Sequence, residues 1–220
     1  MNDKRPPSLP GGIYAFAGDT LPGGRPLGEQ VDTLLAAGAQ CIQLRLKATS
    51  DAMALEETLR ALRSSKAPGR PSPVFIVNDR ADIALLSQAH GLHVGEEDIP
   101  LPVARRLLGT GVLIGKTVRS LEQACRAKEE GADYVGFGPV FETHTKALPV
   151  AALGLPALRH LAQHSPLPVV AIAGICAANI AEVAKAGAHA AAVIADIWQA
   201  PNPAQQLLCL QSLFAKAKAS

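Results

Sequence analysis

Cationic and amide side chains alternate with aliphatic ones in a short segment around residue 45. The segment reads Cys41-Ile-Gln-Leu-Arg-Leu-Lys47. Successive side chains of a strand point to opposite faces, so Gln43, Arg45 and Lys47 share one face and the aliphatic residues share the other. Two cations and an amide on one face predict a binding site for an anion. A solvated edge strand would show the same alternation, and the residues alone leave that alternative open.

Carboxylates follow two later apolar runs. One run ends in Asn78 and Asp79, and the next leads through Gly95, Glu96 and Glu97 to Asp98. Acids at the tips of neighbouring parallel strands converge, and Mg²⁺ takes one or two carboxylates together with waters and phosphate oxygens. The spacing therefore predicts Asp79 and Asp98 as Mg²⁺ ligands. Asp79 as a simple helix N-cap and residues 96–98 as a solvated acidic loop are the alternatives.

Two histidines lie within the second of these runs. His90 and His93 have a spacing that metal ligands often show. On a strand, however, residues three apart face opposite ways. We therefore interpret them as core or surface histidines and not as a metal pair.

Hydroxyl and lysine side chains follow two further apolar runs. Ile114 to Thr117 ends one of them, and Gly136 to Lys146 contains Thr143, Thr145 and Lys146. Hydroxyls, a lysine and glycines that let the backbone approach a ligand are the components of a phosphate clamp. The same residue types are common in mobile loops, so this segment alone is weak evidence.

The last two apolar runs end in small residues. Val170 to Ile175 includes Gly174, and Val193 to Ile197 includes Ile194, Ala195 and Asp196. In barrel enzymes the loops after the last two strands and a short helix commonly bind phosphate through backbone N–H groups. A carboxylate there would repel a phosphate, so we expect Asp196 to cap the helix from outside.

Positioning these residues requires a repeated strand and helix pattern. Apolar runs alternate with segments of helical periodicity, and the expected strands are Gly12–Ala17, Cys41–Leu46, Val74–Val77, Gly91–Val94, Val112–Lys116, Asp133–Phe137, Pro168–Ala173 and His189–Ile194. The expected helices are Pro26–Ala37, Asp51–Ser64, Arg80–Ser87, Leu101–Leu108, Leu121–Glu130, Val150–His164, Ala178–Ala186 and Pro203–Lys216. Glycines just after three helices, Gly38, Gly131 and Gly187, suit helix C-caps. An α/β fold of the (β/α)8 TIM-barrel type is predicted over an open doubly wound sheet, because no GxGxxG follows the first strand.

Composition restricts the function classes. The chain has 220 residues, 18% of them charged, and a net charge of +2 without a basic stripe, which disfavours nucleic-acid binding. Residues 1–11 are polar and Pro-rich and are expected to form a disordered leader to a single catalytic domain at 12–220, with no signal peptide. The long apolar stretch from Val169 to Ile194 is interrupted by polar residues, so no membrane contact and a cytoplasmic location are expected. The four scattered cysteines, Cys176 among them, suit reduced thiols.

Taken together, these segments resemble the thiamine-phosphate synthase family over Ile13 to Trp198. The matching pieces are QLRLK at 43–47, NDR at 78–80, HVGEEDIP at 93–100, IGKT at 114–117, DYVGFGPVFETHTK at 133–146 and VVAIAGI at 169–175. The resemblance implies a cytoplasmic, Mg²⁺-dependent transferase of thiamine biosynthesis. Such an enzyme moves a hydroxymethylpyrimidine group from its diphosphate to thiazole phosphate, which gives thiamine phosphate and diphosphate.

The resemblance also implies residue roles. The diphosphate would be held by Arg45, Lys47, Asn78, Thr117 and Lys146, with Gln43 near the pyrimidine. Asp79 and Asp98 would bind Mg²⁺, and the thiazole phosphate would contact Thr143, Thr145, Gly174, Ile194 and Ala195.

The chain departs from the usual family pattern at several positions, namely Glu96, Thr117, Glu142, Ala173 and Ala195. Ala173 replaces a common glycine and Ala195 a common serine, so the thiazole-phosphate half of the site is the less secure half. Two alternatives follow: a thiazole tautomerase, whose members typically carry histidine where this chain has Arg119, and a non-catalytic barrel that binds a thiamine precursor. Whether the chain forms a homo-oligomer is left open.

Overall fold

Eight strands, each followed by a helix, and a ninth helix after the last of these make up the part of the chain that the computed structural model describes, residues 7–66, 72–143 and 151–219. The strands are β1 Gly12–Gly18, β2 Cys41–Arg45, β3 Val74–Asn78, β4 Gly91–Val94, β5 Leu113–Val118, β6 Tyr134–Phe137, β7 Val169–Ala171 and β8 Ala190–Val193. The helices are α1 Leu27–Ala36, α2 Asp51–Ser64, α3 Ala81–Ser87, α4 Leu101–Leu108, α5 Leu121–Glu129, α6 Gly154–His164, α7 Ile180–Lys185, α8 Ala195–Trp198 and α9 Pro203–Ala219.

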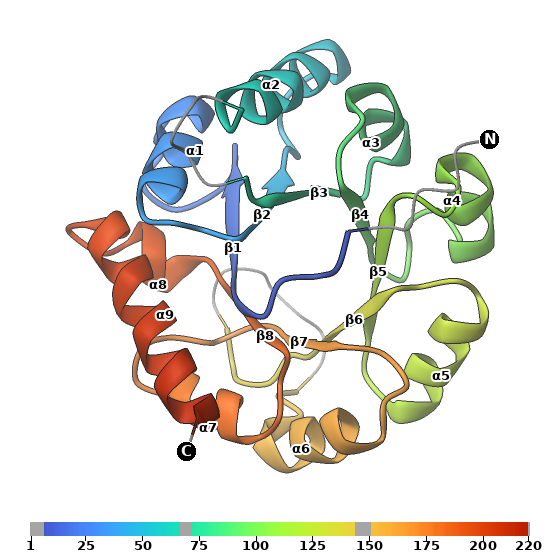
Figure 1. The fold of residues 1–220 in the computed structure, drawn as a ribbon, viewed down its shortest axis with the longest axis vertical. Coiled ribbons are helices and arrows are strands. Elements are labelled where there is room, and N and C mark those ends of the chain that lie inside the picture. The colour runs from blue at the N-terminus through green and yellow to red at the C-terminus, as the bar shows by residue number, and fades with distance from the viewer. Residues whose placement is uncertain (1–6, 67–71, 144–150, 220) are drawn as a thin grey trace.

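The strands close into a barrel with every neighbouring pair parallel, and the helices form a ring around it (Figure 1). The predicted TIM barrel is therefore confirmed. Strand β2 pairs with β1 on one side and β3 on the other, so it is not a solvated edge strand. Because all strands run the same way, their C-terminal ends meet at one rim of the barrel, where this fold carries its chemistry.

Alternation along the strands separates two apolar layers. Ile42 and Leu44 belong to the large cluster between barrel and helices, whereas Cys41 belongs to a smaller cluster inside the barrel. Gln43 shares the inward face with Cys41 and is 2% exposed. The predicted inward orientation of the polar side chains of β2 is thus confirmed at Gln43.

The predicted elements match the observed ones within a few residues. The glycines expected as helix C-caps, Gly38, Gly131 and Gly187, have φ of 72°, 98° and 100°, the left-handed conformation that ends a helix. Helix α7 is shorter than expected and α9 longer. Helix α8 is a single turn directly after β8, in the place where the phosphate-site expectation requires a short helix.

The expected leader is described from residue 7 onward. Leu9 is 8% exposed and packs in the cluster inside the barrel, and its carbonyl oxygen lies 2.9 Å from His189 Nε2. The packed part of the chain therefore begins before Gly12. All four cysteines are unpaired thiols, as predicted.

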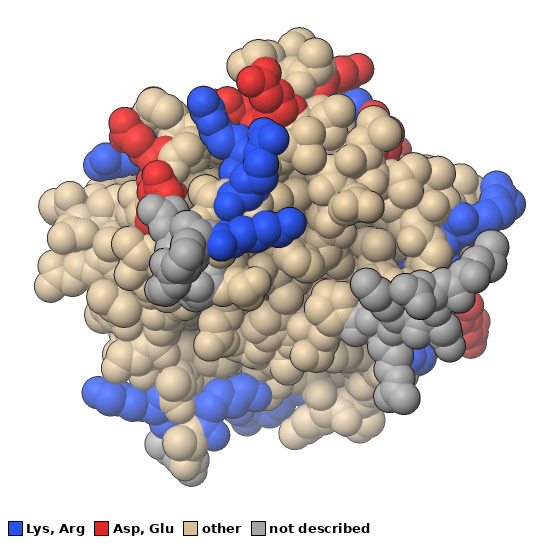
Figure 2. Space-filling model, turned by 45° about the horizontal axis from the view of Figure 1, so that its top comes forward, with Lys and Arg blue, Asp and Glu red and all other residues tan. Residues whose placement is uncertain are grey.

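The surface carries both signs of charge. On the face drawn in Figure 2, Lys and Arg side chains of the described residues gather in separate groups, with acidic groups beside one of them. None of the described helices is long and apolar enough to cross a membrane.

Candidate active site at the C-terminal rim

Three charged side chains from consecutive strand ends meet at the rim. Lys47 follows β2, Asp79 follows β3 and Asp98 lies in the loop after β4. Lys47 Nζ forms an ion pair with Asp79 Oδ2, and Asp79 lies within interaction distance of Asp98. The barrel therefore brings the predicted pair of carboxylates together with Lys47, from residues up to 51 positions apart.

Asp79 has a left-handed backbone with φ of 62°. Its backbone N–H donates to the carbonyl of His93 on β4 over 2.8 Å, which fixes the residue against the neighbouring strand. The N-cap of α3 is Arg80, so the alternative that Asp79 is only an N-cap is wrong. Non-glycine residues rarely adopt this conformation without a structural or functional reason.

The two carboxylates differ in their tendency to ionise. Burial, reinforced by the neighbouring Asp98, raises the pKa of Asp79 above its ordinary value. Burial acts in the same direction on Asp98, but contact with Asp79 and the Gly95 N–H, 2.6 Å from Asp98 Oδ2, lower the pKa of Asp98. Two adjacent carboxylates repel one another when both are charged, so the pair favours a bound cation.

The pair suits Mg²⁺. Within the described residues no group of three or more His, Cys, Asp or Glu side chains could enclose a metal ion. Mg²⁺ does not need such a cage, because it commonly takes one or two carboxylates and completes its octahedron with water and phosphate oxygens. Asp79 and Asp98 provide hard oxygen donors of that kind, and Lys47 already places a positive charge beside them.

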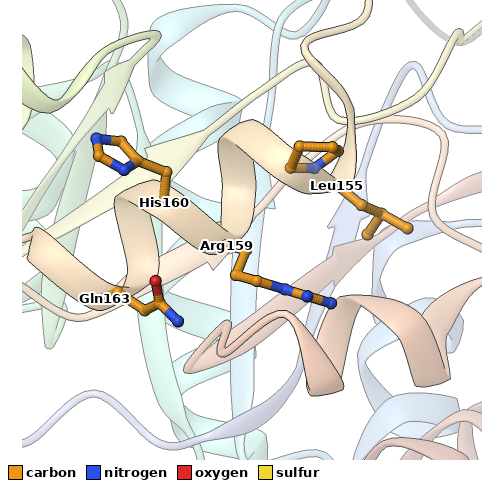
Figure 3. A pocket seen from close by; sticks show the side chains of 5 residues that line it. Leu155, Arg159, His160 and Gln163 are labelled. Atoms are coloured by element: carbon orange, nitrogen blue, oxygen red, sulfur yellow. The ribbon is translucent and has the colours of Figure 1, made fainter.

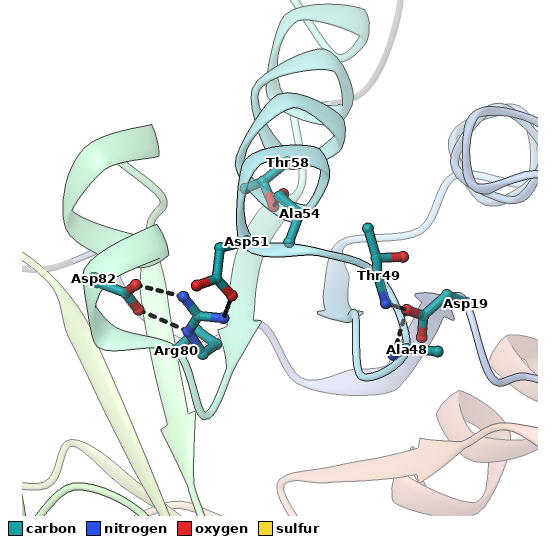
Figure 4. A network of polar contacts seen from close by, with 8 residues as sticks. All are labelled: Asp19, Ala48, Thr49, Asp51, Ala54, Thr58, Arg80 and Asp82. Atoms are coloured by element: carbon teal, nitrogen blue, oxygen red, sulfur yellow. Dashed lines mark hydrogen bonds and ion pairs between the residues drawn. The ribbon is translucent and has the colours of Figure 1, made fainter.

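The β1–α1 loop binds Arg45 at the end of β2 and the backbone of the segment that follows it. Arg45 NH1 donates to Thr20 Oγ1 over 2.7 Å. The carboxylate of Asp19 accepts the backbone N–H groups of Ala48 and Thr49 at 2.8 Å each (Figure 4). It also accepts the backbone N–H of Lys47 at 2.9 Å. The loop that carries Lys47 is therefore tied to β1 through charge-assisted hydrogen bonds.

Asp19→Asn is expected to lower stability by about 1 kcal/mol at neutral pH, because an amide nitrogen cannot accept the bonds that Oδ2 accepts. Burial raises the pKa of Asp19, but the hydrogen bonds from residues 47–49 outweigh it and lower the pKa overall. A carboxyl whose pKa is lower in the folded than in the unfolded protein stabilises the fold at pH values above its ordinary pKa. This stabilisation is lost as the pH falls through the pKa of the folded state. Urea unfolding should show a difference from wild type that is constant near pH 7 and shrinks below about pH 4. A difference independent of pH would contradict the role of the charge, and Glu56→Gln is the matched surface control.

Arg80 joins the two helices that flank the metal-ligand candidates. Its guanidinium contacts Asp82 through two nitrogens, at 2.9 and 2.6 Å, and Asp51 at 2.6 Å (Figure 4). Asp82 lies on α3 and Asp51 begins α2, so the residue next to Asp79 ties both helix starts together. The sequence match contained Arg80 without suggesting this task.

A chain of polar side chains crosses the barrel interior below the rim. It joins Gln43, Tyr14, Tyr134, His93 and Thr117. Burial lowers the pKa of His93 to about 4, so the imidazole is neutral near pH 7. The sequence-based interpretation of His93 as a core or surface residue missed its contact with Thr117, and it did not single out either tyrosine. Strand alternation does place His93 on the inward face, which was the available signal.

The opposite side of the rim is built from glycine and alanine. Gly174 has φ of 68°, and a Cβ added there would lie 2.4 Å from the Glu142 carbonyl oxygen. The β7–α7 loop thus lies directly against the β6–α6 loop. Ile194 is the N-cap of α8 and Ala195 is its first residue, so backbone N–H groups are available at the predicted phosphate position.

Ala173 precedes Gly174 and also has a left-handed backbone, with φ of 72°. An L-residue with a side chain pays for this conformation and glycine does not, although glycine gains more entropy on unfolding. Ala173→Gly is therefore expected to raise the free energy of unfolding by about 0.5–1 kcal/mol. Thermal unfolding measures it, and the control is Ala171→Gly on β7, which should lower stability. If Ala173→Gly proved less stable than wild type, the claim that Ala173 has a strained backbone would be wrong.

Asp196 does not cap its own helix, contrary to the sequence-based expectation. Its Oδ2 accepts from Ala177 N–H at 3.1 Å and from Gln206 Nε2 at 2.6 Å. The carboxylate therefore ties the β7–α7 loop to α9.

The remaining predicted residues divide into three cases. Asn78 ends β3 and is half-buried beside His93 of β4, and Thr143 is half-buried at the end of a described segment. Thr145 and Lys146 lie outside the described residues. Glu96 and Glu97 are exposed, as a solvated loop would have them, but Asp98 turns inward to the strand end.

A surface hollow lies elsewhere, on α6. Leu155, Pro156, Arg159, His160 and Gln163 line it, and all belong to that single helix (Figure 3). It includes none of the converging strand ends, so it is not the site that the charges point to.

Comparison with known proteins adds an independent line. A family model described as thiamine monophosphate synthase matches residues 13–197. A thiamine-phosphate synthase of Anaeromyxobacter dehalogenans is 44% identical over 96% of this chain and 90% of its own length. One of Myxococcus xanthus is 43% identical over 99% of both chains. The solved thiamine phosphate pyrophosphorylase of Pyrococcus furiosus is 32% identical with a TM-score of 0.83 over 94% of this chain and 96% of that one.

Proposed function

The chain belongs to the thiamine-phosphate synthase family, whose members are transferases of thiamine biosynthesis, and we propose that its rim site carries out that reaction with Mg²⁺. The substrates are a hydroxymethylpyrimidine diphosphate and a thiazole phosphate. The products are thiamine phosphate and diphosphate. The observation that carries the proposal is the meeting of Lys47, Asp79 and Asp98 at the ends of three strands.

The chemistry requires stabilisation of a leaving group more than proton transfer. The carbon–oxygen bond breaks with its electron pair going to the diphosphate, and the thiazole nitrogen then forms the new bond to the benzylic-type carbon. Arg45, Lys47 and Lys146 neutralise the charge that develops on the diphosphate, which is where preorganised cations lower a barrier most. Bound Mg²⁺ supplies further charge neutralisation on the phosphate oxygens.

Each half of the rim has its own ligand in this proposal. Asp79 and Asp98 hold the metal, Asn78 and Thr117 donate hydrogen bonds to the diphosphate, and Gln43 lies beside the pyrimidine. The thiazole phosphate lies on the other side, at Thr143, Thr145, Gly174, Ile194 and Ala195. No base is needed, because the thiazole nitrogen already carries a lone pair.

Arg119 supports a synthase over a tautomerase. The resembling tautomerases typically carry histidine at this position, whereas here Arg119 NH1 lies 2.7 Å from Glu96 Oε2. A guanidinium holds its protons tightly and has no acceptor, so an arginine is poorly suited to an isomerase that must move a proton.

The test is a two-substrate assay. Purified protein should release diphosphate and form thiamine phosphate only when both substrates and Mg²⁺ are present, and a chelator should abolish both products. A folded protein that converts a thiazole tautomer without Mg²⁺ would establish the tautomerase instead. Tight binding of thiazole phosphate in calorimetry without turnover would establish a non-catalytic barrel.

A further inference from the structure

Five polar side chains form a continuous line through the barrel interior. Gln43 Nε2 donates to Tyr14 Oη over 2.9 Å, the two tyrosine hydroxyls lie 2.8 Å apart, Tyr134 Oη lies 3.1 Å from His93 Nδ1, and His93 Nε2 lies 3.0 Å from Thr117 Oγ1. Tyr14 and Tyr134 are 2% and 0% exposed. No buried side-chain nitrogen or oxygen of the described residues lacks a hydrogen-bond partner.

The first bond of the line and the burial of both tyrosine hydroxyls together favour one direction for all the others. Each hydroxyl has a single hydrogen to donate, and a neutral imidazole has one N–H. Tyr14 accepts from the Gln43 amide, and if it also accepted from Tyr134, its own buried hydrogen would face no acceptor along this line. Burial therefore favours donation from Tyr14 to Tyr134, and the hydrogen of Tyr134 then goes to His93 Nδ1. His93 must therefore carry its proton on Nε2 and donate it to Thr117 Oγ1.

We infer that this one-way chain of hydrogen bonds from Gln43 to Thr117 presets the Thr117 hydroxyl as a donor to a phosphate oxygen at the rim. Thr117 already accepts from His93, so its hydrogen is directed to a further acceptor. At the other end, the Gln43 amide nitrogen is engaged by Tyr14, which leaves the carbonyl oxygen as the acceptor that Gln43 offers to a ligand. Tyr14, Tyr134 and His93 are thus positioning residues, and this inference rests on the proposed function for the identity of the ligand.

The barrel makes room for the chain with glycines. A Cβ at Gly115 would lie 2.1 Å from Cζ of Tyr134, and a Cβ at Gly136 would lie 3.0 Å from Cε1 of His93. Neither glycine has a positive φ, so the turn geometry does not require them. Because these glycines lack a Cβ, the rings of Tyr134 and His93 can lie against the backbone of β5 and β6.

The direct test is made on the wild-type protein, and a variant serves only to assign the signals. Long-range ¹H–¹⁵N spectra of protein labelled at histidine nitrogens distinguish the two tautomers, and His93→Asn identifies the His93 signals among the six histidines. The inference expects the Nε2–H tautomer in the ligand-free protein. The Nδ1–H tautomer would reverse the chain and overturn the inference, whether or not the protein proves to be a synthase.

The functional test interrupts the line of hydrogen bonds at a residue that does not contact the ligand. Tyr134→Phe removes the link between Tyr14 and His93, and we expect KM for the pyrimidine diphosphate to rise about tenfold, with a mixed tautomer at His93 and a nearly unchanged kcat. Thr117→Val should raise the same KM, Thr117→Ser should not, and the double variant Tyr134→Phe/Thr117→Val should be no worse than Thr117→Val alone. Ile76→Val, an interior change without a polar group, is the control.

The outcomes separate the two proposals. A wild-type protein without turnover would defeat the proposed function but leave the tautomer measurement decisive for the chain. If the wild-type protein is active and a folded Tyr134→Phe variant has an unchanged KM and an unchanged His93 tautomer, the inference about the hydrogen-bond chain is overturned and the proposed function is not. Additive effects of Tyr134→Phe and Thr117→Val would likewise show that the two residues act separately, and so overturn it.

Discussion

Asp98→Asn is expected to lower kcat on the order of a hundredfold and to leave the fold intact. The amide keeps the shape of the carboxylate, and its oxygen can still accept the Gly95 N–H that now lies 2.6 Å from Oδ2. What is lost is a negative charge beside the metal position. Calorimetric titration with Mg²⁺ should show weaker binding, and the thermal unfolding midpoint should change little.

Asp79→Asn should behave in the same way, and its backbone makes it a clean test. Asparagine is among the few residues that tolerate a left-handed conformation, so the φ of 62° should survive. Glu97→Gln is the matched control, because Glu97 is an exposed acid in the same loop as Asp98. Full activity in both aspartate variants would refute the metal assignment.

Gly174→Ala is expected to raise KM for the thiazole phosphate on the order of a hundredfold while KM for the pyrimidine diphosphate stays within about twofold. The φ of 68° disfavours a side chain, and the new Cβ would lie 2.4 Å from the Glu142 carbonyl oxygen and 2.6 Å from Phe141 Cβ. The first of these atoms belongs to the backbone and the second is attached to it, so neither can move without its loop. The two loops must therefore separate to admit the new Cβ.

Steady-state kinetics with each substrate varied in turn will measure the split between the two KM values. Ala173→Gly is the matched control, since it changes the neighbouring residue in the favourable direction and should leave both KM values near wild type. Unchanged KM for the thiazole phosphate in a folded Gly174→Ala protein would remove this loop from the phosphate site.

Strand alternation and strand order account for most of what could be predicted about the site. The two-residue period of a strand predicted Gln43, Arg45 and Lys47 on one face, and the helices expected outside the barrel made that face the inward one. The structure confirms this at Gln43, whereas β2 ends at Arg45 and Lys47 follows it. Placing Asp79 and Asp98 at the same rim required in addition that all strands run parallel, which the helix between each pair made the expected arrangement. The resemblance to the family includes the NDR motif at 78–80. It did not predict that Arg80 binds the carboxylates of Asp51 and Asp82, because no local pattern connects them to it.

The residues that were missed share a physical cause. Asp196 was expected to cap its own helix because a free carboxylate there would repel a phosphate, yet its partners are Ala177 and Gln206, on other elements. His93 was set aside because a spacing rule for metals failed, while its partners are hydroxyls across the barrel.

The sequence by itself determined the elements, their parallel order, the inward face of β2 and the family. The elements follow from the periods of two and 3.6 residues that the backbone imposes locally, and the family follows from short motifs. The closed barrel alone decided that Tyr14 meets Tyr134, 120 positions away, and that a line of polar side chains joins Gln43 to Thr117. A contact of that kind depends on the curvature of all eight strands together, and no window of sequence contains it.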